Sequence, residues 1–165
     1  MKVLGIDPGT AIVGWGILEQ QDNSKEIKTI DYGQITTSAD LPNPERLNLI
    51  GEDLKELIKE YKPDEVAVEE LFYFKNKKTV ITVAQARGVI LYICKNKKLP
   101  IGEYTPLQIK QALTGYGRAD KKQMQLMIKN VLKLKEIPKP DDAADALAVS
   151  FCHLNSRLYQ QKLNS

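Results

Sequence analysis

The chain has 165 residues and a formal net charge of +3, with 42% hydrophobic and 27% charged residues. This composition is typical of a globular domain with an apolar core, and it excludes a disordered or fibrous chain. No apolar stretch reaches the roughly 18 residues that a membrane span requires, so we expect a cytoplasmic protein without membrane contact. Cys94 and Cys152 lack metal-site spacing and lie among apolar neighbours, which predicts buried, reduced thiols.

The first part of the chain predicts three strands followed by a helix. Residues 2–7 form an apolar run typical of a buried strand, and two further segments, at 13–18 and 27–35, also have the pattern of strands. Apolar residues then recur at helical spacing, which predicts an amphipathic helix over residues 45–61 that ends before Pro63.

The second part of the chain alternates strands with helices. Two strands are expected at residues 65–70 and 100–104. Four helices are expected at about 77–95, 106–113, 121–134 and 142–158. This order of elements predicts an α/β fold with a five-stranded mixed sheet flanked by helices. No linker or repeat divides the chain, so residues 1–165 are expected to form a single domain that ends in a flexible tail over about 159–165.

Positive charge is concentrated in the middle of the chain. Between Lys75 and Lys135 there are 14 basic and two acidic residues, a local charge of +12, whereas the rest of the chain carries −9. Three lysine clusters, at 75–78, 95–98 and 121–122, could follow the phosphates of a nucleic acid. A single cluster of this kind is usually a solvated helix end, but three in one region indicate a surface for a polyanion.

Four acidic residues stand in segments that otherwise resemble a protein core. Asp7 and Glu69 each close an apolar run, while Asp142 and Asp145 flank two alanines. A buried carboxylate must be paired, protonated or bound to a cation, and carboxylate oxygens are the ligands that Mg²⁺ and Mn²⁺ prefer. The four acids are therefore predicted to form one metal site.

Each acid also has a purely structural explanation. Asp-Pro-Gly is a favoured turn sequence, so Asp7 could form a turn rather than bind a ligand. One of the two consecutive strand residues Glu69 and Glu70 would normally be exposed to solvent. Asp141 and Asp142 follow prolines and could cap a helix, an explanation that we favour for Asp141.

Four short motifs together resemble those of a known family. They are Gly5-Ile6-Asp7-Pro8-Gly9, Val68-Glu69-Glu70-Leu71-Phe72, Gln85-Ala86-Arg87-Gly88 and Asp142-Ala143-Ala144-Asp145-Ala146-Leu147-Ala148. In this order and at these separations, they resemble the bacterial RuvC family of Holliday-junction resolvases, from Met1 to about His153. The resemblance implies an RNase H-like fold and a homodimer. It also implies a structure-selective endonuclease that places symmetric nicks in four-way DNA junctions during recombination and repair.

The resemblance also implies roles for individual residues. Asp7, Glu69, Asp142 and Asp145 would be a catalytic tetrad that binds two divalent ions, Mg²⁺ or its substitute Mn²⁺. Phe72 would be a wedge that stacks on unpaired bases, whereas the alternative is an ordinary core phenylalanine. The expected DNA-binding set is Phe72, Lys75, Lys77, Lys78, Lys110, Arg118, Lys121 and Lys122. A branch-migration helicase complex of the RuvA and RuvB type would be a further partner.

The predicted helix over residues 79–95 is apolar on nearly all sides. Such a helix needs burial on more than one face, and small residues at Ala84, Ala86 and Gly88 would allow another helix to approach closely. A symmetric dimer across this helix would bury the surplus apolar surface and relate two active sites by a two-fold axis. The alternative is that other elements of the same chain cover all of its faces.

Three other functions are compatible with parts of this pattern. Gly5-Ile6-Asp7-Pro8-Gly9-Thr10 also resembles the phosphate loop of actin-like ATPases and sugar kinases, but those proteins need two such domains and an adenosine motif. A non-catalytic junction-binding module would not need the four acids. A nuclease of the same fold that processes ribosomal RNA is the nearest enzymatic alternative, against which the Phe72 segment and the basic middle region favour branched DNA.

Overall fold

The computed structural model describes residues 1–21, 24, 26–71 and 79–163, with side chains up to Arg157. Its five strands are β1 (Lys2–Asp7), β2 (Ile12–Gln20), β3 (Ile27–Thr36), β4 (Glu65–Glu69) and β5 (Ile101–Tyr104). Its five helices are α1 (Asn43–Tyr61), α2 (Val80–Asn96), α3 (Pro106–Thr114), α4 (Lys121–Val131) and α5 (Asp141–Leu163). The α/β class and the five-stranded sheet flanked by helices, both predicted from the sequence, are thus confirmed.

The strands form one mixed sheet in the order β3-β2-β1-β4-β5. The first three strands are an antiparallel meander, whereas β4 and β5 run parallel to β1. The carboxyl ends of β1, β4 and β5 therefore meet at one edge of the sheet, which is where open α/β sheets commonly carry their functional groups. Asp7 and Glu69 are the last residues of β1 and β4.

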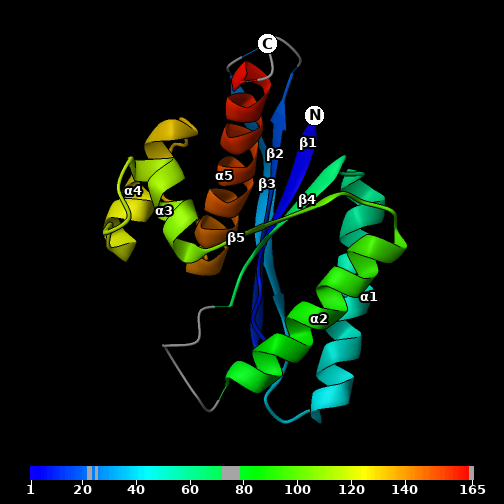
Figure 1. Ribbon diagram of the computed structural model, residues 1–165. Coiled ribbons are helices and arrows are strands. Elements are labelled where there is room, and N and C mark those ends of the chain that lie inside the picture. Colours follow the sequence, from blue (N-terminus) through cyan, green and yellow to red (C-terminus); the bar gives the residue numbers. More distant parts are fainter. Residues whose placement is uncertain (22–23, 25, 72–78, 164–165) are drawn as a thin grey trace.

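Helices cover both faces of the sheet and create two separate cores (Figure 1). On one face, α1 and α2 pack on a cluster that includes Leu4, Ile6 and Val68. On the other face, α5 lies along the strands, and α3 and α4 pack against it around a cluster that includes Val3 and Ala67. Alternation along a strand thus separates the two cores, since odd-numbered residues of β1 and β4 point toward α5.

The ends of several elements differ from the prediction. The strand expected to end at residue 70 ends at Glu69, and the helix expected to reach residue 134 ends at Val131. Leu132 caps that helix, and Lys133 then adopts a left-handed backbone conformation with a φ of 53°, which a helix cannot continue through. The last helix extends to Leu163, five residues beyond the expected end at residue 158.

Candidate active site

Asp7 and Glu69 lie next to each other at the ends of two neighbouring parallel strands. The register pairs Ile6 of β1 with Val68 of β4, so the two acids that follow are adjacent across the sheet. Because side chains alternate between the two faces along a strand, both acids lie on the face that α5 covers, as Val3 and Ala67 do. Asp7 can therefore precede a turn and Glu69 can lie on an alternating strand while both side chains belong to one site on this face.

The first turns of α5 bring Asp142 and Asp145 to the same place. Asp7 is paired with Gly14 of β2, and a Cβ atom at Gly14 would lie only 2.0 Å from the Asp142 carbonyl oxygen. Farther along, a Cβ atom at Gly5 would lie 2.3 Å from the carbonyl oxygen of Ala146. Glycine is thus required at both positions for α5 to approach the sheet this closely.

The electrostatic environment of Asp7 reveals how the four acids affect one another. Burial raises the pKa of Asp7 well above its usual value, and the charges of Glu69, Asp145 and Asp142 raise it further, in that order. A hydrogen bond with the Glu69 side chain acts in the same direction. All four predicted acids therefore belong to one electrostatic site.

Lys121 is a basic neighbour of Asp145, whereas the charges that most affect the pKa of Asp7 are all acidic. Burial is the largest influence on the pKa of Asp145 and raises it, while the Lys121 ammonium group, 3.6 Å from the carboxylate, opposes the rise. Burial alone would lower the pKa of Lys121, but the charges of Asp145, Asp141 and Asp142 raise it overall. Lys121, at the start of α4, thus partly compensates the acidic end of α5.

Asp141 contacts two side chains of α4. Its carboxylate lies 3.3 Å from the Lys121 ammonium and accepts a hydrogen bond of 2.9 Å from Gln125. Asp141 is the first residue of α5, and its described contacts are with α4.

The donor set of the site fits a divalent cation in its chemistry. Four carboxylates supply only hard oxygen ligands, and the repulsion that raises the pKa of Asp7 is what a bound cation would relieve. Within the described residues, however, no three acidic, histidine or cysteine side chains are arranged closely enough to hold a metal ion as they stand. The four acids therefore affect one another electrostatically, but within the described residues they do not form a complete set of metal ligands.

Half of the predicted DNA-binding residues lie in the described part of the chain. Lys110 is on α3, Lys121 and Lys122 begin α4, and Arg118 lies in the loop between these helices. Arg118, Lys121 and Lys122 are exposed, and Lys110 is partly buried. The others, namely Phe72, Lys75, Lys77 and Lys78, lie outside the described residues.

The small residues of α2 do not share one environment. Ala84 and Gly88 are exposed, whereas Ala86 is fully buried in the core beneath α1 and α2. Ala86 was expected at a dimer interface, but its side chain is already covered by its own chain and cannot contact a second copy. A helix that is apolar on nearly all sides gives no signal of which face turns inward.

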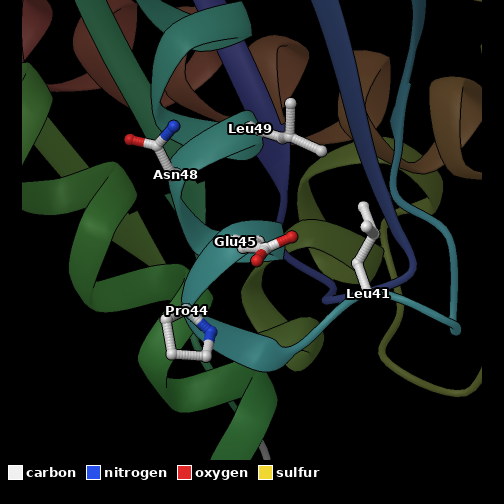
Figure 2. A pocket seen from close by; sticks show the side chains of 5 residues that line it. All are labelled: Leu41, Pro44, Glu45, Asn48 and Leu49. Atoms are coloured by element: carbon white, nitrogen blue, oxygen red, sulfur yellow. The ribbon is translucent and has the colours of Figure 1, made fainter.

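A shallow hollow of about 520 Å³ lies beside the first two turns of α1 and contains none of the four acids. Figure 2 shows the residues that line it, which are Leu41, Pro44, Glu45, Asn48 and Leu49. Its walls offer one carboxylate and no cluster of polar groups, so the hollow adds nothing to the chemistry of the site.

No helix within the described residues combines the length and apolar character that a membrane crossing needs.

Known proteins resemble this chain along nearly its entire length. A family model described as crossover junction endodeoxyribonuclease RuvC matches residues 3–153. The protein of that name from Syntrophomonas wolfei is 58% identical over 156 residues, which are 94% of this chain and 90% of that protein.

Solved structures agree with the sequence relatives. The structure of Thermus thermophilus RuvC superposes with a TM-score of 0.87 at 34% identity, over 96% of each chain. The structure of T. thermophilus RuvC in complex with Holliday junction substrate gives a TM-score of 0.84 at 31% identity, again over 96% of each chain. These matches confirm the RNase H-like fold and the resemblance on which it rested, and the chain belongs to the RuvC family of crossover junction endodeoxyribonucleases.

Proposed function

We propose that this protein resolves four-way DNA junctions by hydrolysing phosphodiester bonds at the site formed by Asp7, Glu69, Asp142 and Asp145. The observation that carries the proposal is that the charges of Glu69, Asp145 and Asp142 all raise the pKa of Asp7, although the four acids come from three elements far apart in the sequence. Such a concentration of like charge is costly for folding, and it is typical of sites that bind metal ions for catalysis. Family membership supports the same reaction.

The four acids have different parts in this proposal. Two Mg²⁺ ions, for which Mn²⁺ would substitute, would supply Lewis-acid chemistry that activates the attacking water and stabilises the departing 3′ oxygen. Asp7, whose pKa is raised by the charges of all three other acids, would be a shared ligand. Glu69 would hold its side of the site from β4, and Asp142 and Asp145 would hold the other side from α5.

Basic residues beside the acids would hold the DNA. Lys121 lies 3.6 Å from Asp145, so a phosphate bound near the acids would be within reach of its ammonium group. Lys110, Arg118 and Lys122 would extend this contact over α3 and α4, because ammonium and guanidinium groups neutralise backbone phosphates. Phe72 remains a proposed base-stacking wedge, with Lys75, Lys77 and Lys78 as phosphate contacts that follow it.

A homodimer through α2 would match the two-fold symmetry of a four-way junction. An exposed stripe with apolar residues runs along this helix through Ile81, Ala84, Gly88 and Tyr92, and the side chains at its two ends are 68% and 69% exposed. Pairing two such stripes would remove apolar surface from water. It would also relate two active sites by a two-fold axis, so that the nicks would be placed symmetrically in strands of like polarity. Action on chromosomal junctions would occur in the cytoplasm, with RuvA- and RuvB-type helicase proteins as partners.

The proposal is tested with three labelled substrates in Mg²⁺, a mobile four-way junction, a duplex and an RNA–DNA hybrid. We expect paired nicks in the junction and little cleavage of the other two. Asp7→Asn should abolish the nicks but retain junction binding, because it removes a ligand charge without changing the basic surface. Asp53→Asn, an exposed acid on α1, is the matched control and should cleave like wild type.

Two results would contradict the proposal. One is equal cleavage of duplex and junction, which would remove the structure selectivity. The other is undiminished cleavage by Asp7→Asn, which would place the chemistry elsewhere.

A further inference from the structure

The backbone of Glu69 has an unusual position in the sheet. The N–H group of Glu70 donates a hydrogen bond of 2.8 Å to the carbonyl oxygen of Tyr104 in β5. In a trans peptide the preceding carbonyl points in the opposite direction, so the carbonyl of Glu69 is directed toward β1. In a regular parallel ladder this carbonyl would accept a hydrogen bond from β1.

Pro8 prevents β1 from supplying that hydrogen bond. The register pairs Ile6 with Val68, so the donor opposite the Glu69 carbonyl would be the backbone nitrogen of residue 8. This residue is Pro8, which has no N–H group. The turn that positions Asp7 therefore removes the strand partner of the Glu69 carbonyl, and another donor is needed.

Arg87 of α2 supplies the missing donor. Its Nε atom donates a hydrogen bond of 3.1 Å to the Glu69 carbonyl oxygen, and its terminal nitrogen forms an ion pair with Glu103 of β5. The Arg87 side chain is only 17% exposed, so solvent does not compete freely for these contacts. Glu103 is the register partner of Val68, and the guanidinium group thus bridges the ends of β4 and β5.

We propose that Arg87 is a positioning residue that sets the orientation of the Glu69 carboxylate in the metal site. Glu69 is the last residue of β4, and its side-chain direction depends on the backbone that Arg87 holds. This inference rests on the proposed function, in which Glu69 is a metal ligand.

The test compares Arg87→Met with Glu103→Gln. Arg87→Met removes the donor to the Glu69 carbonyl, whereas Glu103→Gln removes the ion pair and leaves that donor in place. Mn²⁺ affinity is measured by calorimetry without DNA, and the nicking rate, junction binding in EDTA and thermal unfolding are measured in parallel. We expect Arg87→Met to lose about 10- to 100-fold in Mn²⁺ affinity and nicking rate, as residues that orient metal ligands usually do.

Two further readouts distinguish positioning from a general structural role. The nicking defect of Arg87→Met should shrink as Mn²⁺ is raised, while its junction binding stays near that of wild type. Glu103→Gln should keep Mn²⁺ affinity within about twofold, because the carbonyl contact persists. If Arg87→Met does not fold, Arg87→Lys decides the question, since it retains the charge but not the planar group that bridges both strands.

The inference is overturned if the folded Arg87 variant binds Mn²⁺ as wild type does. It is also overturned if both variants lose Mn²⁺ affinity in proportion to a loss of thermal stability. Failure of the wild type to nick any junction would contradict the proposed function instead, and the Mn²⁺ comparison would still test the role of Arg87.

Discussion

The two ends of β4 carry glutamates with opposite surroundings. Glu65 and Glu69 are four residues apart in one strand, so both side chains point toward α5. At the first end, α5 presents His153, whose Nε2 atom lies 2.7 Å from the Glu65 carboxylate, and Arg157, which forms an ion pair with it. At the other end, the same helix brings two aspartates to Asp7, which lies beside Glu69 in the sheet.

The Glu65 end is a satisfied polar network. His153 is 5% exposed, and its Nδ1 atom is 2.9 Å from the hydroxyl oxygen of Tyr104, so both ring nitrogens have partners. The Glu65 carboxylate has a guanidinium group on its other oxygen. A network of this kind stabilises the fold, because every buried polar group in it is paired.

At the Glu69 end, by contrast, acids gather, because the charges of Glu69, Asp145 and Asp142 all raise the pKa of Asp7. The contrast teaches that one helix and one strand can supply both a stabilising polar network and a cluster of acids when the two are separated along their length. Network contacts at the first end hold α5 on the sheet, and this helix then carries two acids into a place where their charge opposes folding. We therefore expect substitutions at the two ends to separate stability from activity.

The largest expected effect is the loss of cleavage in Glu69→Gln. The substitution keeps the shape of the side chain but removes a ligand charge, so nicking of a labelled junction should fall below detection. Stability without divalent ions should not decrease, because a repulsive neighbour of Asp7 has been removed. Urea denaturation in EDTA measures the second quantity.

Glu65→Gln is the matched substitution at the other end and should retain nearly the full nicking rate. If Glu65→Gln and Glu69→Gln lose activity equally, the division of β4 into a structural end and a catalytic end is wrong.

Local sequence patterns were sufficient to predict that the four acids lie together. Asp7 and Glu69 interrupt apolar runs at strand ends, and Asp142 and Asp145 have the three-residue spacing of one helix face, so each acid is visible in its own segment. The succession of elements also predicted a mixed sheet flanked by helices, although not the order of its strands. These features depend on residues close together in the chain.

The structural end could not be predicted, because its contacts join distant segments. Glu65 and His153 are 88 residues apart, and neither stands out from its local sequence. The same holds for Arg87 of α2, whose proposed role depends on the missing N–H group of Pro8 in the turn after β1. The close approach of α5 at Gly14 likewise depends on a pairing that no local pattern encodes.

A smaller effect is expected on stability when the Glu65 network is broken. In Glu65→Gln the neutral amide replaces the carboxylate between His153 and Arg157, and one of its two hydrogen-bond positions becomes a donor. The free energy of unfolding should decrease by about 1–3 kcal/mol, the usual value for a hydrogen bond to a charged group. Urea denaturation of wild type and variant checks this, and an unchanged midpoint would contradict it.

The smallest expected effect is a pH dependence of opposite sign at the two ends. Burial lowers the pKa of His153 from its usual 6.5 despite the nearby Glu65 carboxylate, so the unfolded chain binds this proton more readily than the folded chain. Stability from His153 is therefore complete above pH 6.5 and is lost as the pH falls toward the lowered pKa, by at most about 1.4 kcal/mol per pH unit.

Asp7 responds in the opposite direction. Its pKa is raised above 3.8 by burial and by the neighbouring acids, so the folded chain binds its proton more readily, and acidification toward pH 3.8 relieves a destabilising charge. In wild type the two contributions have opposite signs as the pH falls from 6.5 to 3.8. Asp7→Asn removes the compensating contribution, so its unfolding free energy in EDTA should fall more than that of wild type over this range. His153→Gln should fall less steeply or rise. If all three proteins have parallel pH profiles, neither group titrates differently in the folded chain, and the electrostatic contrast between the two ends of β4 would not hold.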